Sequence, residues 1–318
     1  MSFSSNVKQE LTDHMSKARH CRLAELSAMI SMAAKVTMDP CGITIHSESH
    51  FVSEKADRIL SEVFGIHARV CYRKGRGGSK AKQYSVTLKD PVEARRVLKA
   101  LGMIEKTENG EELQLYMPDR LLERSCCRQA YIRGAFLSGG SINDPTKNYH
   151  TEILSEDRFM AERLQCFLRD YDIESRIIER KRPKGKSVSV LYLKDGEQIV
   201  DLLSVVKAHR ALMELENVRI IKDVRNKVNR QVNCETANLN KTVNASVKQV
   251  NDIRYLMDHG GMALLTPELK EMAMVRLENE NTPLKDLGKM VDPPVSKSGV
   301  NHRLRRLSEI AQNLRDQH

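Results

Sequence analysis

Residues 130–142 read AYIRGAFLSGGSI, and this stretch decides the fold. Its small and apolar residues predict a helix that ends on the pair Gly139-Gly140. Gly134 lies inside this helix, where glycine costs about 1 kcal/mol relative to alanine. A helix keeps such a residue most readily where another backbone comes close. The stretch is therefore expected to be one partner of a tightly packed helix pair.

The same pattern recurs 106 residues earlier, where residues 24–36 read AELSAMISMAAKV. In this alignment Ala28 matches Gly134, and Ala33-Ala34 match the glycine pair. The second stretch supplies the expected partner helix. The first two thirds of the chain therefore read as a duplication.

Hydrophobic periodicity predicts the same order of elements in both copies: helix, strand, helix, β-hairpin and helix. The pattern allows one further short strand in each copy. In the first copy the predicted elements are a leading helix at 4–15, then 21–34, 42–47, 52–64, 67–72, 83–88 and 91–101. In the second copy they are 128–138, 149–154, 157–170, 174–179, 188–193 and 198–206.

Both predicted hairpin turns are basic and lie at equivalent places in the two copies. The first cluster comprises Arg73, Lys74, Arg76, Lys80 and Lys82. The second comprises Arg180, Lys181, Arg182, Lys184 and Lys186. Two interpretations stay open, accessory contacts to DNA or to a protein partner, and simple solvated surface hairpins.

Composition indicates a basic globular protein. The length of 318 residues predicts about two domains. A net charge of +10 and a pI near 9.2 favour a polyanionic partner, most simply nucleic acid. A basic protein without such a partner is the alternative. Tryptophan is absent and aromatic residues make up 4% of the chain, which argues against base-stacking platforms for single strands.

Seven cysteines are scattered along the chain, and no two of them form a C-x-x-C pair. This usage predicts a reducing cytoplasm, and it argues against a disulfide framework and against a zinc site. No apolar run is long enough to span a membrane, and the first ten residues lack the pattern of a secretory signal. We therefore predict no membrane association, no metal and no cofactor.

The last sixty or so residues predict three short helices. The first covers 267–279, the second begins at Thr282-Pro283-Leu284 with a capping threonine, and Ser298 is expected to cap the third. Val300, Leu304, Leu307 and Ala311 of the third helix are expected to form its buried stripe. The predicted DNA-contacting residues on its other faces are Lys297, Ser298, Asn301, His302, Arg303, Arg305 and Arg306. This arrangement is typical of a helix-turn-helix, and the alternative is a helical cap or dimerisation bundle.

Between the duplication and the helix-turn-helix lies a charged helix at 211–226, followed by an asparagine-rich stretch that we interpret as a connector. The expected domain organisation has four parts. An N-terminal helix with the first half of the duplication covers 1–118, and the second half covers 119–210. A helical connector covers 211–260, and the helix-turn-helix domain covers 261–318.

The stretch at 130–142 resembles the signature helix of the LAGLIDADG homing endonucleases, in which two such helices pack at a pseudo-twofold axis. The resemblance implies an α+β fold, a duplicated saddle of two sheets that straddles DNA, with the basic hairpins flanking it. In that family acidic residues near the helix ends hold the catalytic metal. Here those positions fall on Leu137 and Gly139, and on Ser31 and Ala33 in the first copy. None is a carboxylate, so the resemblance implies the frame without the chemistry.

The order of parts resembles that of the WhiA family, a degenerate LAGLIDADG domain joined to a helix-turn-helix. The supporting segments are CCRQAYIRGAFLSGGSINDPTKNYHTEI, AHRALMELENVRIIKDVRNKVNRQVNCETANLNKT and VDPPVSKSGVNHRLRRLSEIA. The pair Ala33-Ala34 departs from the glycine pair of the second copy. The resemblance implies a cytoplasmic, nucleoid-associated regulator of sporulation or cell-division genes that binds promoter DNA, with RNA polymerase or a co-regulator as its protein partner.

Two other functions stay open. An active metal-dependent endonuclease would need carboxylates elsewhere, and Asp144 and Glu152, just after the signature helix, are the candidates. An architectural protein would bind DNA without sequence preference. On the residues of the signature helices we expect no catalysis.

Overall fold

The computed structural model describes residues 2–74, 82–108, 110–181 and 187–316. The chain divides into two compact units, Met1–Lys222 and Asp223–His318. Helix α8 (His209–Asp258) contributes residues to both units. Each unit is described by itself.

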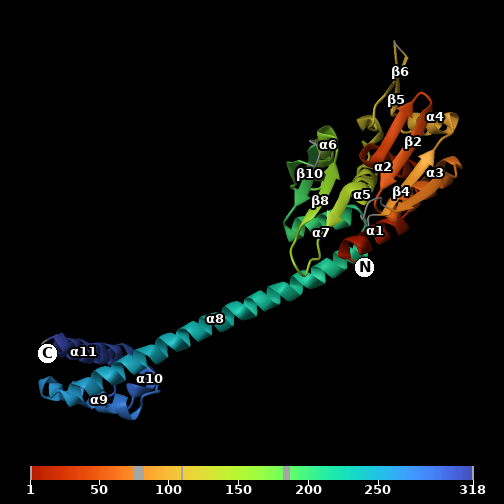
Figure 1. Ribbon diagram of the computed structural model, residues 1–318. Helices are drawn as coiled ribbons and strands as arrows, with labels where there is room; N and C mark the ends of the chain where they lie inside the picture. The colour runs from red at the N-terminus through yellow and green to blue at the C-terminus, as the bar shows by residue number, and fades with distance from the viewer. Residues whose placement is uncertain (1, 75–81, 109, 182–186, 317–318) are drawn as a thin grey trace. The chain divides into compact units, whose positions relative to one another are not determined.

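The first unit contains the duplicated part of the chain (Figure 1). The leading helix and first copy comprise α1 (Phe3–Asp13), α2 (Arg19–Ala33), β1 (Ala34–Met38), β2 (Cys41–Ser47), α3 (His50–Phe64), β3 (Arg69–Lys74), β4 (Lys82–Leu88) and α4 (Pro91–Ala100). A two-stranded ribbon of β5 (Ile104–Thr107) and β6 (Gly110–Leu113) and the short turn η1 (Asp119–Leu121) follow. The second copy comprises α5 (Ser125–Gly139), β7 (Gly140–Ile142), β8 (Thr151–Ser155), α6 (Arg158–Arg169), β9 (Arg176–Lys181), β10 (Ser187–Leu193) and α7 (Gly196–Val205).

The two copies form four-stranded antiparallel sheets of matching order, β1-β2-β4-β3 and β7-β8-β10-β9. Helices α2 and α5 lie side by side between these sheets (Figure 1). The predicted duplication and the mixed α+β class are therefore confirmed. Each copy contains the further short strand that the sequence pattern allowed. These strands are β1, which follows α2 without a loop, and β7, which follows α5 in the same way.

The signature helix ends on the glycine pair, as predicted. Residues 140–142 are not helical but form β7, which pairs with β8. A Cβ atom on Gly139 would lie 2.4 Å from the carbonyl oxygen of Leu154 in β8. The chain therefore passes from helix to strand where the backbone of β8 is too close for a side chain.

Helices α2 and α5 approach each other at Gly134, as the sequence predicted. A Cβ atom there would lie 2.3 Å from the carbonyl oxygen of Glu25 and 3.1 Å from the Cβ of Ala28. Ala28 is the residue that the duplication aligns with Gly134. The two matched positions therefore meet at the pseudo-twofold axis, where only small residues let the backbones touch.

A buried ionic cluster crosses the same contact and was not predicted. The Arg133 guanidinium donates from Nε and Nη2 to the two carboxylate oxygens of Glu25, at 3.1 and 3.0 Å. Lys55 Nζ of α3 lies 3.2 Å from Glu25, and its burial lowers its pKa. All three side chains are at most 2% exposed. Loss of one partner from such a cluster typically costs about 3–5 kcal/mol, because a buried charge is left unpaired.

The predicted helical connector is one continuous helix that includes the asparagine-rich stretch, although only residues 211–226 were predicted to be helical from their own sequence. Helix α8 continues without a break to Asp258. Each asparagine costs only about 0.7 kcal/mol relative to alanine, and extending a helix that is already nucleated is much easier than starting one. Buried residues anchor it within each unit, Ala211 and Leu215 in the first and Ile253 and Leu256 in the second. Helix propensity depends on local sequence and therefore does not reveal these tertiary contacts.

The second unit contains the end of α8, the turn η2 (Gly261–Leu264), α9 (Pro267–Glu278), α10 (Leu284–Leu287) and α11 (Lys297–Asp316). Its core combines residues of all these helices. They include Ile253, Leu256, Met272, Ala273, Leu287, Val300, Leu304 and Leu307. In the described part of the chain, no helix combines the length and apolar character needed to cross a membrane.

The helix contact can be tested by replacing Gly134 with alanine. The added methyl group meets backbone rather than a movable side chain, so the free energy of unfolding of the first unit should fall by about 1–3 kcal/mol. Chemical denaturation followed by circular dichroism measures this loss. The control is Gly196→Ala, where the nearest atoms are ring atoms of Tyr149 at 3.3 Å and the change should stay below about 1 kcal/mol. Equal stability of the two variants would contradict the close approach.

Candidate nucleic-acid interface

Helix α11 begins two residues earlier than its predicted cap implies. Ser296 Oγ accepts the N–H of Gly299 at 3.2 Å, and its carbonyl oxygen accepts the N–H of Val300 at 3.0 Å. Ser296 is therefore the N-cap, and the prediction that Ser298 caps the helix was wrong. The preceding loop is closed where Val295 N–H donates to the carbonyl of Gly288 at 2.8 Å, which fixes the start of the helix. Ser298 stays exposed on the first turn.

The buried stripe of α11 is as predicted. Val300, Leu304, Leu307 and Ala311 are all at most 1% exposed. Their spacing of three and four residues places them on one side of the helix, against the core of the second unit. The remaining sides of the first three turns are left for polar residues.

Most residues predicted to contact DNA lie on these exposed sides. Those that are exposed are Lys297, Ser298, Asn301, His302, Arg305 and Arg306. Arg303 differs, because its side chain is only 18% exposed and lies 3.8 Å from the Glu268 carboxylate of α9. Its Nη1 is buried without a hydrogen-bond partner among the described residues. Arg303 therefore belongs to the contact between α11 and α9 more than to the outer face.

The outer face of α11 is free of acidic residues up to Glu309. The Glu309 carboxylate lies 3.5 Å from Arg305 and 3.1 Å from Arg306, in exposed pairs of the kind that contribute little and exchange readily. Both arginines can turn to a stronger anion. Glu309 itself repels phosphate, so the face suited to nucleic acid is the first three turns of α11.

The helix before α11 is short. Helix α10 has four residues. Its N-cap is Pro283 instead of the predicted Thr282, and no side chain caps the helix. Thr282 instead uses its carbonyl oxygen to accept a 2.8 Å hydrogen bond from the buried Arg276. Met290, three residues after this helix, is 50% exposed. Nine residues separate α10 from α11, which is longer than the usual three or four of a helix-turn-helix.

The first four-stranded sheet has a polar, cationic outer face. Alternate residues of β2 such as Ile43 and Ile45 point into the core, while Thr44 and His46 lie on the other face. A shallow groove on this face is lined by Thr44, His46, Arg69, Cys71, Arg73, Gln83, Ser85, Thr87 and Lys89. Among the described residues that line it, three are Lys or Arg and none is a carboxylate.

The basic hairpin residues of the first copy lie at one end of this sheet. Arg73 and Lys74 belong to β3 and Lys82 to β4, with Lys74 opposite Lys82 in the register. Arg76 and Lys80 lie outside the described residues. Sequence reasoning missed His46, Arg69 and Lys89 because it considered only the turn. The alternation along the predicted strands was the signal that could have found them.

The second sheet presents a different balance of charge. Arg180 and Lys181 are exposed on β9, and Arg182, Lys184 and Lys186 lie outside the described residues. Arg180 donates to Glu152 of β8 at 2.9 Å. On the opposite face of β9, Arg158 donates to Glu179 at 2.9 Å. Ion pairs therefore offset part of the positive charge of this sheet, whereas the described residues that line the groove of the first sheet include no carboxylate.

The positions of the endonuclease metal site offer no hard ligands. Ser31 Oγ donates to the carbonyl oxygen of Ser27 at 2.8 Å, and Leu137 is fully buried. The two alternative carboxylates serve other purposes. Asp144 accepts two hydrogen bonds from Thr146, which lower its pKa, and Glu152 pairs with Arg180. Within the described ranges, no cluster of three or more metal-binding side chains includes a carboxylate.

Three family models match successive parts of the chain. They describe a WhiA N-terminal LAGLIDADG-like domain at residues 19–104, a WhiA LAGLIDADG-like domain at 128–225 and a WhiA C-terminal HTH domain at 228–311.

Similar proteins cover almost the whole chain. "Probable cell division protein WhiA" of Alkaliphilus oremlandii is 41% identical over 320 residues, which are 99% of this chain and 98% of that protein. Its namesake in Clostridium botulinum is 41% identical and covers 99% of each chain. A crystal structure of "full-length DUF199/WhiA from Thermatoga maritima" matches with a TM-score of 0.60 and 23% identity, over 98% of this chain and 99% of that one. The last comparison shows the same fold.

The start of α11 can be tested with two serine variants. Ser296→Ala removes the cap and should lower the free energy of unfolding of the second unit by about 1 kcal/mol, within a range of about 0.5–2 kcal/mol. Ser298→Ala is the matched control and should change it by less than about 0.5 kcal/mol. Thermal or urea unfolding measures both. If Ser298→Ala lowered the free energy of unfolding more than Ser296→Ala, the N-cap would instead be Ser298, as the sequence suggested.

Proposed function

The chain belongs to the WhiA family, and from this premise we propose that it is a sequence-specific DNA-binding regulator of transcription that controls sporulation or cell-division genes. The observation that carries the proposal is the outer face of α11. Over three turns it presents hydrogen-bonding and cationic side chains and no acid before Glu309. A dimerisation face would present apolar residues instead.

In this proposal the first turns of α11 enter the major groove. Ser298, Asn301 and His302 lie nearest the base edges, and Lys297 contacts the DNA backbone. Asparagine reads adenine and arginine reads guanine through paired hydrogen bonds, each worth about 1–3 kcal/mol of discrimination.

The arginines of α11 take different roles. Arg305 and Arg306 divide between bases and phosphates after leaving Glu309. Arg303 was expected to join them, but its pairing with Glu268 and its low exposure favour a positioning role that sets α11 against α9. The phosphate contacts make the affinity depend on salt.

The duplicated domain is proposed to hold DNA or a protein partner without cutting DNA. Cleavage of a phosphodiester through a divalent ion needs oxygen ligands, and the four inherited positions are serine, alanine, leucine and glycine. The cationic groove of the first sheet suits accessory contacts to phosphates. RNA polymerase or a co-regulator is the alternative partner for this domain. The protein is proposed to act in the cytoplasm, at the nucleoid.

Sequence reading by α11 is tested with Arg305→Ala and Asn301→Ala. Sites are first selected from random duplexes by the full chain, and affinities are then measured by fluorescence anisotropy at fixed salt. Each variant should bind the selected site about 5- to 150-fold more weakly and lose preference at one position, with little change on unrelated DNA. The control, Lys248→Ala on exposed α8 sequence, should keep both properties.

Two outcomes would contradict this placement. One is an Arg305→Ala variant with unchanged affinity and unchanged sequence preference. The other is parent protein that any competitor DNA displaces equally, which would favour the architectural function.

The role of the first sheet is tested by charge reversal. Arg69→Glu with Arg73→Glu should weaken binding to all DNA sequences alike and flatten the salt dependence, because phosphate contacts are lost. The matched pair Arg180→Glu with Lys181→Glu should have a smaller effect, since Glu152 already neutralises Arg180. Unchanged DNA affinity with lost transcriptional control would assign the first sheet to a protein partner instead.

A further inference from the structure

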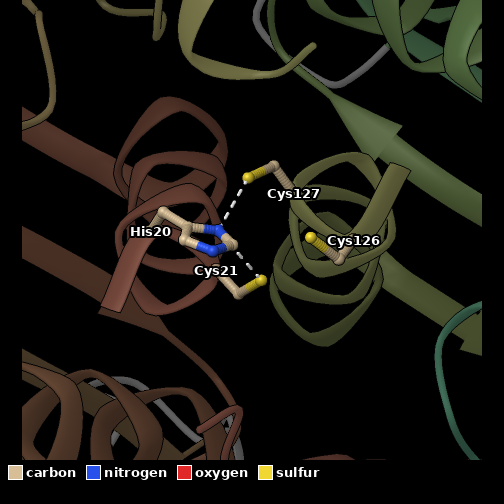
Figure 2. A group of neighbouring side chains, drawn as sticks. All are labelled: His20, Cys21, Cys126 and Cys127. Atoms are coloured by element: carbon tan, nitrogen blue, oxygen red, sulfur yellow. Dashed lines mark hydrogen bonds between the residues drawn. The ribbon is translucent and has the colours of Figure 1, made fainter. Parts of the chain in front are cut away.

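Four soft metal-binding side chains meet where helices α2 and α5 begin. His20 and Cys21 lie in the first turn of α2, and Cys126 and Cys127 lie in the first turn of α5 (Figure 2). One donor atom from each lies within 4.8 Å of the other three. His20 Nδ1 is 3.1 Å from Cys127 Sγ and 3.4 Å from Cys21 Sγ. We propose that these four residues form a tetrahedral zinc site that fastens the two central helices together.

The distances suit this ion. Zn–S bonds of about 2.3 Å and Zn–N bonds of about 2.0 Å at tetrahedral angles place neighbouring donors about 3.5–3.8 Å apart. His20 Nδ1 lies slightly closer than this to the two sulfurs, and all four donor atoms lie within 4.8 Å of one another. Small side-chain rotations are therefore enough to close the donors around one ion.

The donor set also selects the metal and its role. Three thiolates and one imidazole form a soft set that favours zinc over magnesium, calcium or manganese. Four protein ligands fill a tetrahedral site and leave no position for water or substrate. The site is therefore structural rather than catalytic.

Burial raises the pKa of the Cys21 and Cys127 thiols, so an entering metal ion must displace their protons. Two helix N-termini converge on the cluster, and the positive ends of their dipoles partly offset this effect of burial. Arg124 Nη1 lies 3.4 Å from His20 Nε2, so a cation is at hand to balance the net negative charge of a zinc ion with three thiolates. Zinc binding through Nδ1 leaves the proton on Nε2, and Arg124 then turns away from the ring toward the sulfurs.

The cluster follows the duplication of the chain. The offset of 106 residues that aligns the two helices pairs His20 with Cys126 and Cys21 with Cys127. Each copy thus contributes two adjacent ligands from equivalent positions. The site is also separate from the inherited endonuclease positions. Ser31 lies eleven residues further along α2, about 16 Å away at 1.5 Å per residue.

The test uses the full chain, purified without a polyhistidine tag from cells supplied with zinc. Elemental analysis should find about one zinc ion per chain that survives dialysis. Refolding or exchange with cobalt should give the intense visible absorption of a tetrahedral cobalt thiolate. Added zinc should raise the melting temperature of the metal-stripped protein.

The informative variant is Cys126→Ala, because this cysteine is exposed and its loss leaves the core intact. It should lose the tightly held zinc, the cobalt absorption and the rise in melting temperature. The matched control is Cys166→Ala, which removes another exposed cysteine of the same unit and should keep all three.

Three results would overturn the proposal. They are parent protein that takes up neither zinc nor cobalt, equal metal retention in the two variants, and a disulfide within the cluster in freshly purified protein.

Discussion

The close approach of α2 and α5 is the constraint on which the first unit depends. At Gly134 the two backbones come within a distance that excludes even a methyl group. The side chains beside this point must therefore run along the contact, and Glu25, Arg133 and Lys55 do so as a buried cluster in which one carboxylate pairs with both cations. Such a cluster adds little net stability, but it penalises any other register of the two helices. The sheets then take their places from the helices to which they are joined directly.

The sequence was informative wherever a local rule and the tertiary structure agree. Gly134 predicted the close contact because glycine destabilises a helix interior and is kept where another backbone comes close. The spacing of Val300, Leu304 and Leu307 predicted the buried side of α11. The sequence failed where distant atoms decide. The true cap at Ser296 depends on how Gly288 closes the loop, and the helical state of the asparagine-rich part of α8 depends on anchors in both units.

The same distinction applies to the candidate sites. Periodicity identified the outer face of α11, but the half-buried position of Arg303 needed the neighbouring helix. The cysteine spacing argued against zinc because that argument considers ligands close together in one chain segment. Here the candidate ligands are two adjacent pairs 106 residues apart. The duplication itself was the signal, since it aligns one pair with the other.

The metal-binding positions of the endonucleases differ here in backbone packing as well as in residue type. A carboxylate at position 139 would need a Cβ atom 2.4 Å from the Leu154 carbonyl oxygen, so the present backbone has no room for it. Leu137, the other position on this helix, is packed in the core with no exposed surface. Restoring oxygen ligands would therefore require moving β8 away from α5, not only changing side chains. The outer faces of the two sheets are free of this packing constraint, and the difference in charge between them shows that the two copies have diverged there.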